Sequence, residues 1–415
     1  MLKTYLQSPM NFLLMFWLFL ISGNPFFSNI VGSEVLNLIT AFVLFIVFLF
    51  KKIGFNAHEL AIFILFIVIF ILQSVYYNSI YFVTNMGFLI KLFIAYAGIK
   101  LIYNFQYVYI RTMYIVCVLA LSFWTLDLLG VVDDVITMLP YQTISNDGSI
   151  KYLSPVHTFF YEINESFIRN SGLFWEPGAF SAYITLALIF LGIERKNLFR
   201  KEYAKHLIVF VITLLTTLST SGYVVLLFVI ILHYDFSHNV RYCNKKILNI
   251  FLLIIAMVFV ALIFKYFFME LDFIGGKIIR QSEIDLTEYS LSNVTRFGTA
   301  LFDFKYISES PFIGNGLNEA TRYRFHLDNV ITGYSNGFTD FVAKFGIIIT
   351  FVYMAYVFKG LNMLTNSVNK SLYCLAIILL LNNTQGLLNY PIYLSLIFLY
   401  FNPRRYINNS YKNVK

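Results

Sequence analysis

The sequence has few charged residues and almost no cysteine for its length. Of 415 residues, 13% are Asp, Glu, Lys or Arg, and 59% are hydrophobic; a soluble globular domain has roughly twice that charged share. A water-soluble fold cannot hide so much apolar surface, so the composition predicts an integral membrane protein. The three cysteines, Cys117, Cys243 and Cys374, are scattered and form no CxxC pattern or disulfide framework.

Motifs for cofactor chemistry are also missing. No P-loop, GxGxxG or HExxH sequence is present, so cytoplasmic nucleotide chemistry has no support. The acid-x-acid pairs Glu270/Asp272 and Glu283/Asp285 offer too few oxygen ligands to define a metal site, and we predict no metal and no cofactor. The net charge of +8 is explained by membrane topology and anionic lipid headgroups. No nucleic-acid-binding module is visible.

Long hydrophobic segments dominate what is present. They are continuous and do not alternate with period two, so they predict helices and not a barrel. Residues 205–234 are interrupted at 219–222 and predict two short helices, and the last segment begins at Pro391, a residue favoured in a first helical turn. The predicted fold is a single all-α polytopic membrane domain over residues 1–415 with about twelve transmembrane helices. The predicted spans are 9–22, 31–50, 58–77, 80–103, 107–130, 177–194, 205–219, 221–235, 247–268, 338–359, 371–388 and 390–402.

Charge distribution predicts the orientation. With twelve spans, all the basic clusters fall on one side, which the positive-inside rule assigns to the cytoplasm together with both termini. The first span resembles a signal peptide, but Gly23-Asn24-Pro25 is a poor cleavage site and further spans follow, so we expect it to be retained. The clusters lie within residues 51–52, 100–111, 195–201, 241–246 and 404–415.

Two long polar segments, 131–176 and 269–337, lie on the opposite side of this predicted topology. Loops of this length are usually functional or disordered. In the second, Val294, Phe297, Leu301 and Phe304 recur at helical spacing and predict an amphipathic helix on the membrane surface. Pro311 and the following glycines should end it.

The end of the first loop, residues 169–179, combines polar and aromatic residues at the entrance to the sixth span. Glu176 precedes Pro177 and should lie at a helix N-terminus, where the helix dipole stabilises a carboxylate. Glu176 is therefore a candidate catalytic residue, and Arg169 a candidate substrate ligand. The alternative is a structural helix cap beside an interfacial Trp175.

The second loop contains four arginines and one histidine, His326. Guanidinium groups stay charged and match phosphate oxygens, so the arginines predict a diphosphate site; non-specific contact with lipid headgroups is the alternative. If residues 320–328 are helical, Arg322 and His326 share a face, and Arg324 pairs with Asp328 as an ordinary surface ion pair. The four predicted ligands are Arg280, Arg296, Arg322 and Arg324.

Lys91 lies near the centre of the fourth predicted span. A charge there costs about 2.5–3.5 kcal/mol on insertion scales, so we expect Lys91 to face a polar interior, pair with an acid such as Glu34, or snorkel to the interface. It is included among the candidate substrate ligands.

Three stretches resemble the O-antigen polymerase family, within the wider group that includes O-antigen ligases. The first stretch is residues 169–179, similar to an Arg/Gly-Leu-Phe-x-Glu-Pro segment. The second is 295–297 followed by 310–316 (Ser-Pro-Phe-Ile-Gly-Asn-Gly), and the third is 335–338 leading to 344–346 (Lys-Phe-Gly). Ligase-like members have a histidine where this chain has Ser335, which favours polymerase and leaves the general base open.

The resemblance implies a metal-independent glycosyltransferase at the periplasmic face of a bacterial inner membrane. Its substrate would be an undecaprenyl-diphosphate-linked oligosaccharide, with membrane lipids around it and a chain-length regulator and flippase as pathway partners. His326 and Glu176 are the candidate bases. The rivals are an O-antigen ligase acting on lipid A-core and a lipid-linked oligosaccharide flippase; a flippase predicts charges within the spans and not in the loops.

Overall fold

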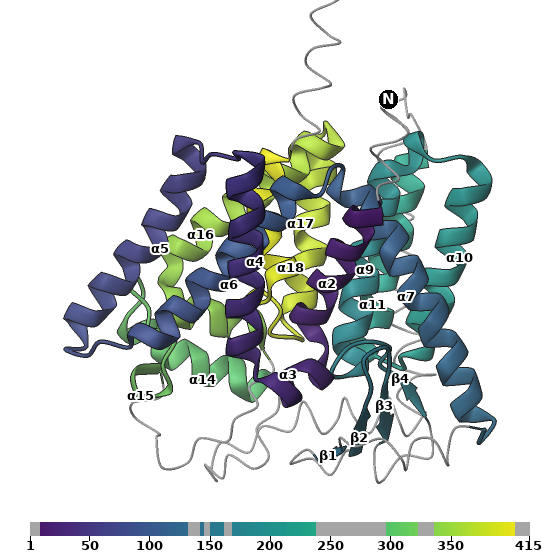
Figure 1. Cartoon of the computed structure of the whole chain (residues 1–415), viewed down its shortest axis with the longest axis horizontal. Coiled ribbons are helices and arrows are strands. Elements are labelled where there is room, and N and C mark those ends of the chain that lie inside the picture. The colour runs from purple at the N-terminus through teal and green to yellow at the C-terminus, as the bar shows by residue number, and fades with distance from the viewer. Residues whose placement is uncertain are drawn as a thin grey trace, which may run out of the picture.

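The computed structural model describes residues 9–131, 142–144, 150–161, 168–237, 296–322 and 336–402. These residues are mostly helical (Figure 1). Each predicted span outside 247–268 contains a helix, and residues 205–234 form two helices, as their interruption predicted. The longer helices are α2 (Pro9–Gly23), α4 (Ser33–Lys51), α5 (Ala57–Tyr76), α6 (Phe82–Leu101), α7 (Phe105–Leu128), α9 (Pro177–Glu194), α10 (Arg200–Thr216), α11 (Thr220–Ser237), α14 (Arg296–Glu309), α16 (Gly337–Thr365) and α17 (Val368–Asn382).

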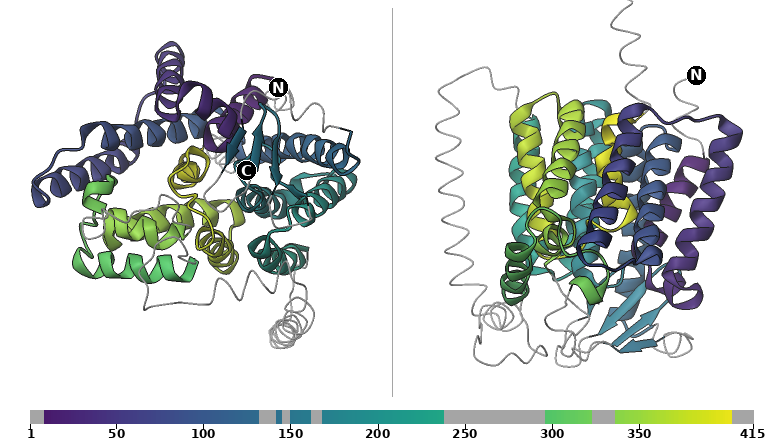
Figure 2. Two further views of the ribbon diagram at one scale, coloured as in Figure 1. Left: turned by 90° about the horizontal axis from the view of Figure 1, so that it is seen from below. Right: turned by 90° about the vertical axis from the view of Figure 1, so that its left-hand side faces the viewer.

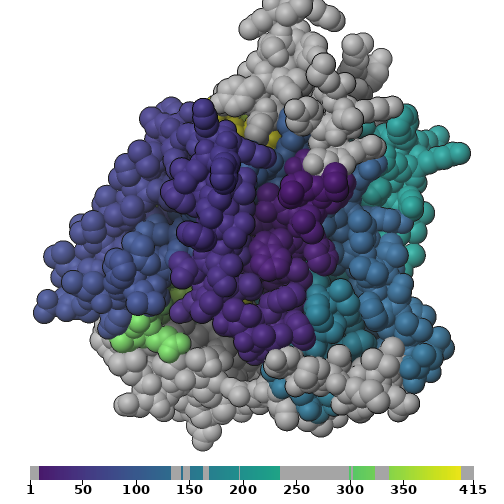
Figure 3. All heavy atoms as spheres, in the orientation of Figure 1, coloured from purple at the N-terminus to yellow at the C-terminus, as the bar shows by residue number. Residues whose placement is uncertain are grey.

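Six helices in the described part of the chain, α4, α5, α6, α7, α9 and α16, are long and apolar enough to cross a membrane. The number is seven if α2 and α3 (Pro25–Val31), which meet at a 73° bend, count as one span. Shorter apolar helices lie at Thr220–His233, Val368–Asn382 and Pro391–Phe401. The outer face of α4, at the front of Figure 3, exposes Leu38, Phe42 and Leu49. An exposed apolar face of this length matches a hydrocarbon environment.

Two elements form the buried centre of the bundle. Every residue of α9 except Ile193 is buried. The last helical segment, α18 (Pro391–Leu394) continued by η5 (Ser395–Phe401), is buried along almost all its length; Figure 2 shows it in yellow, surrounded by other helices. A helix that is apolar all round belongs inside a bundle, which explains why these two segments carry no polar face.

A small antiparallel sheet corrects the all-α prediction. Strands β1 (Gln142–Ile144), β2 (Ile150–Leu153), β3 (Thr158–Tyr161) and β4 (Arg169–Asn170) pair in sequence order within the first long loop. Each strand has two to four residues, too few for a period-two pattern to be recognised in the sequence.

The sheet and three of the shorter helices gather at one end of the long helices. The sheet, α3, α14 and α15 (Glu319–Arg322) lie together at the lower end in Figure 1, while the α4–α5 and α9–α10 connections lie at the upper end. Elements from both predicted long loops are therefore at the same end, opposite basic residues such as Lys51 and Arg200.

The helix α16 is broken. Gly346 has φ +79° and ψ 167° inside it, and Gln73 of α5 donates to the Lys344 carbonyl at the break, with an N–O distance of 2.8 Å. Interrupted membrane helices persist where neighbouring groups satisfy the freed backbone. The backbone groups that the break leaves without helical partners therefore need hydrogen bonds from elsewhere in the protein.

Candidate functional site

The second and third stretches are joined by backbone contacts at the break in α16. Asn315 N donates to the Ala343 carbonyl, Gly316 N to the Lys344 carbonyl, and Ile347 N to the Pro311 carbonyl. A Cβ on Gly314 would lie 2.4 Å from the Lys344 oxygen, and one on Gly346 2.2 Å from the Phe312 oxygen. Both glycines have positive φ, so the Gly-x-Gly and Lys-Phe-Gly patterns are explained by one close backbone crossing.

The first and third stretches meet on the turn between α17 and α18. A Cβ on Gly178 would lie 2.4 Å from Gln385 Nε2, and one on Gly337 would lie 2.2 Å from the Gln385 carbonyl oxygen. The N-termini of α9 and α16 therefore both pack on Gln385. Contacts therefore connect all three stretches of the resemblance, although more than 110 residues separate the first from the others.

Glu176 lies at the N-cap position of α9, but its side chain does not cap the helix. It is partly exposed, and among the described residues its carboxylate has no hydrogen-bond or ion-pair partner. One carboxylate oxygen lies 3.6 Å from the position of a Cβ on Gly178. The side-chain cap that stood as the structural alternative is not formed, so the carboxylate is available for other contacts.

Aromatic and amide groups fix the chain around Glu176. Trp175 stacks on Tyr390 with 4.8 Å between ring centroids, and the Glu176 carboxylate is close enough to act on Tyr390 electrostatically. Phe174 stacks on Tyr183 at 4.1 Å. Asn24, at the bend between α2 and α3, donates to the Leu173 carbonyl at 3.1 Å. The bend in the first span therefore supports this site.

Arg169, predicted as a substrate ligand, contacts other parts of the protein. Its guanidinium donates to the carbonyls of Thr217 and Leu218, at 3.3 Å each, where α10 ends, and it is 8% exposed. Its Cζ lies 5.7 Å from the Phe160 ring centroid. A cation on the last carbonyls of a helix complements the helix dipole, so these contacts favour a structural role.

Arg322 belongs to a buried ion cluster. It pairs with Asp303 of α14 and lies 3.5 Å from Asp340 of α16, and its side chain is 1% exposed. Asp340 pairs with Lys344 at 2.5 Å, and Thr339 donates to Asp303 at 2.5 Å. The cluster balances two cations with two carboxylates and ties α14, α15 and α16 together.

Burial has an electrostatic consequence for this cluster. Desolvation raises the pKa of Asp303 to about 6, and Asp340 acts in the same direction, whereas the Arg322 guanidinium opposes both. The Arg322 guanidinium thus favours the ionised form of Asp303, which the ion pair requires.

The predicted amphipathic helix over 294–304 exists as α14, and it ends at Glu309 before Pro311, as predicted. It packs on α16 through a polar face that includes Asp303 and Tyr306, both fully buried, while Phe304 of the apolar series is 56% exposed. The face of α14 that carries Asp303 therefore packs against α16, and Phe304 of the predicted membrane-facing series stays exposed. The cost of burying the Asp303 carboxylate is offset by its pairing with Arg322 and by the hydrogen bond from the Thr339 hydroxyl.

Of the remaining candidate ligands and bases, the structure describes some side chains and leaves others outside the described residues. Lys91 of α6 is half-buried and makes no ion pair with Glu34 among the described residues; Lys344 and Glu34 both act on it electrostatically. Arg296 begins α14, but its side chain is not described. Three predictions lie outside the described residues: Arg280, Arg324 and His326, the last with its proposed i,i+4 relation to Arg322.

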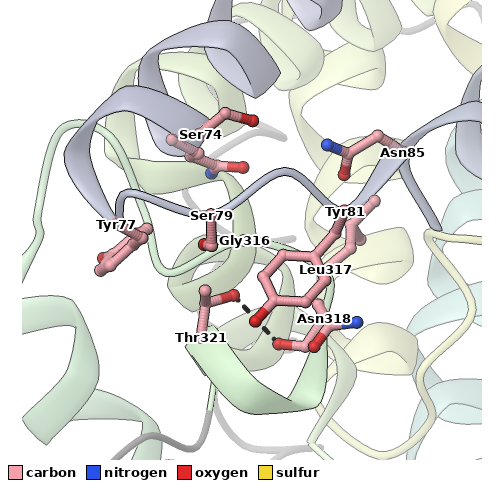
Figure 4. A pocket seen from close by; sticks show the side chains of 10 residues that line it. Ser74, Tyr77, Ser79, Tyr81, Asn85, Gly316, Leu317, Asn318 and Thr321 are labelled. Carbon is pink, nitrogen blue, oxygen red and sulfur yellow. Dashed lines mark hydrogen bonds between the residues drawn. The ribbon is translucent and has the colours of Figure 1, made fainter. Parts of the chain in front are cut away.

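A small uncharged hollow lies beside this region, between the α5–α6 turn and residues 316–321 (Figure 4). It has about 230 Å³ of empty space. Tyr77, on its wall, donates to Ser310 Oγ at 2.9 Å and so holds the second stretch in place. The lining residues are Gln73, Ser74, Tyr77, Ser79, Tyr81, Asn85, Gly316, Leu317, Asn318 and Thr321.

The site residue that sequence reasoning missed is Gln385. It lies in a turn without any recognisable motif, and only its contacts with Gly178 and Gly337 identify it.

No protein-family model and no curated protein matches the chain. Residues 333–337, Gly-Tyr-Ser-Asn-Gly, fit the short GxSxG pattern of serine hydrolases, and Ser335 lies outside the described residues. Among those residues no group of three His, Cys, Asp or Glu side chains is placed to hold a metal.

Proposed function

We propose that the protein is a membrane glycosyltransferase that joins undecaprenyl-diphosphate-linked oligosaccharide repeat units, as an O-antigen polymerase does. The growing glycan leaves its lipid diphosphate and passes to the non-reducing end of the incoming unit. One observation carries the proposal: the three stretches that resemble this family are linked by contacts although they are distant in sequence. The first and third share Gln385, the second and third share the break in α16, and the first contains a carboxylate that has no partner among the described residues.

The chemistry fits groups that this chain possesses. A lipid-linked donor arrives activated, so no nucleotide site is needed. Glu176 or His326 accepts the proton of the attacking sugar hydroxyl. The departing diphosphate gains negative charge, which pre-positioned guanidinium groups stabilise. Arg280, Arg296 and Arg324 keep this proposed role, whereas the ion cluster assigns Arg322 to positioning α15.

The proposed location is a bacterial inner membrane, with about twelve spans, both termini in the cytoplasm and the site on the periplasmic face. Reporter fusions at Asn146 and Asn315 are expected to be periplasmic, and fusions at Asn197 and Asn244 cytoplasmic. If fusions at Asn197 and Asn315 report the same side, the span count is wrong.

The lipopolysaccharide ladder of a deletion strain tests the reaction. Loss of a polymerase leaves a single repeat unit on the lipid A-core. A core without any repeat unit indicates instead a ligase or a flippase, and an unchanged ladder contradicts all three functions.

Replacing a predicted diphosphate-binding arginine by lysine tests its role without changing its positive charge. Lysine offers a compact point charge and not a planar fork, so Arg296→Lys should shorten the polymer at matched membrane abundance, and Arg296→Ala should be worse. Losing one donor of this kind typically lowers the rate about 10²–10³-fold. A full ladder from the Arg280→Ala/Arg296→Ala double variant shows that these arginines contact only lipid headgroups.

The two candidate bases are separated by replacing each alone. Glu176→Gln keeps the shape and removes the proton acceptor, and His326→Ala does the same for the imidazole. The variant of the true base should lose polymer while its membrane abundance stays normal. Normal polymer from both variants removes both candidates.

A further inference from the structure

The N-terminus of α9 and the turn between α17 and α18 both bring hydrogen-bond donors close to Gly178. Pro177 has no N–H, and Glu176 does not cap the helix, so the first turn leaves the N–H groups of Gly178 and Ala179 without intrahelical partners. Gln385 packs its Nε2 against Gly178, 2.4 Å from where a Cβ of that glycine would be. Donors gathered at a helix N-terminus match the lone pairs of a ligand oxygen.

Gln385 is itself unusual. It is 5% exposed, and its side-chain amide makes no hydrogen bond with the described residues. Its amide nitrogen and oxygen are not fully enclosed by the protein, so a ligand can reach them. An accessible amide beside a helix N-terminus is suited to a partner that is not part of the chain.

An acceptor lies near the same glycine. A Glu176 carboxylate oxygen is 3.6 Å from the Gly178 Cβ position, so donors from two elements and one carboxylate gather around Gly178. A simple anion is disfavoured beside Glu176 by like-charge repulsion. A hydroxyl group satisfies both sides, because it donates its proton to the carboxylate and accepts from the amide.

We propose that Gln385, the N-terminus of α9 and Glu176 bind the hydroxyl group of the acceptor sugar; this inference rests on the proposed function. Glu176 accepts the hydroxyl proton, and the oxygen forms the new bond to the anomeric carbon of the donor. The bond from that carbon to the phosphate oxygen breaks, and its electron pair leaves with the lipid diphosphate. The amide and the helix N-terminus hold the attacking oxygen. Gly178 is needed because a side chain there would clash with the Gln385 amide.

The test uses lipid-linked repeat units purified from the deletion strain and added to membranes with each variant at matched abundance. Gln385→Ala is expected to lower the rate of joining about tenfold, the effect of one lost hydrogen bond. Asn383→Ala is the control, since Asn383 is exposed on the same turn, and should match the wild type.

Gln385→Glu separates binding from packing, because it preserves the shape. The new carboxyl and Glu176 share one proton at intermediate pH, because two like charges this close resist ionising together. In that state Glu176 can accept the hydroxyl proton and the protonated carboxyl can donate, so the variant should lose activity as the pH rises further, where the wild type stays active. A residue that only fills space gives no such pH dependence.

The outcomes distinguish the two proposals. If the wild type joins no units and the deletion strain keeps its ladder, the proposed function fails and this inference fails with it. If Glu176→Gln abolishes joining while Gln385→Ala and Gln385→Glu both behave as the wild type at every pH, the function stands and the hydroxyl site is overturned.

Discussion

Two polar regions at the same end of the molecule differ in how their groups are paired. In the cluster of Asp303, Arg322, Asp340 and Lys344, each charged group has an oppositely charged partner. At the junction of Glu176 and Gln385, a carboxylate and an amide lie close together without described partners. Side chains that pair with each other hold parts of the protein together, whereas polar side chains without a partner remain available to a ligand. The comparison therefore indicates a structural role for Arg322, which the sequence predicted as a substrate ligand. It indicates a ligand-binding role for Gln385, which the sequence did not predict.

The largest effect is expected from breaking the paired cluster. Arg322→Ala leaves Asp303 buried without its cation, and removing one partner of a buried pair typically costs about 3–5 kcal/mol. Thermal unfolding in detergent and membrane abundance measure the loss. Arg111→Ala is the control, because the Arg111–Glu202 pair is partly exposed and should contribute less than about 1 kcal/mol. An Arg322→Ala protein as stable as the control contradicts the structural role.

The backbone crossing that links the second and third stretches should be nearly as sensitive. Gly346→Ala places a Cβ 2.2 Å from the Phe312 oxygen at a φ of +79°. Strained backbone and overpacking each cost about 1–3 kcal/mol, so we expect a loss of about 3 kcal/mol. Gly87→Ala in α6, where a Cβ meets nothing within 4 Å, should be neutral. Equal stability of the two variants contradicts the crossing.

The sheet beside the Glu176 junction should depend on pH. His157 is 2% exposed, and burial lowers its pKa from 6.5 to about 3. Its contribution to stability is complete above the unfolded pKa of 6.5 and decreases as the pH falls from 6.5 towards 3, reaching a loss of about 2 kcal/mol at pH 5. Hydrogen exchange over residues 150–161 at pH 7 and pH 5 should show the loss, and His157→Phe should abolish it. His58→Phe, at an exposed position, should leave the pH dependence unchanged.

The smallest effect on stability is expected at the open junction. Because Glu176 has no described partner, Glu176→Gln should change stability by less than about 0.5 kcal/mol, even where it abolishes activity. Glu59→Gln is the matched control: Glu59 is fully buried, pairs with Lys100 and accepts from Tyr96 Oη at 2.8 Å, and should cost clearly more. A large loss from Glu176→Gln, measured by the same unfolding assay, indicates that this carboxylate has a structural partner.

The sequence by itself determined that long apolar helices fill the chain, the position of most of them and the existence of two helices within 205–234, because these depend on local hydrophobicity and turn-forming residues. The break between those two helices lies at 217–219, slightly before the predicted 219–222. It also indicated that residues 169–179, 310–316 and 335–346 are important. The short strands of the sheet escaped recognition because two to four residues carry no usable periodicity.

The tertiary structure alone decided which polar groups are paired and which are open. The sequence does not distinguish Arg322 and Arg169 from arginines that bind phosphate. In the structure Arg322 pairs with Asp303, and Arg169 donates to the carbonyls at the end of α10, so both make structural contacts. Gln385 has no motif around it, and it joins the site because Gly178 and Gly337 lack the side chains that would exclude it. Gly178 and Gln385 are more than 200 residues apart in the chain, so their proximity depends on how the helices pack, and no local sequence pattern encodes it.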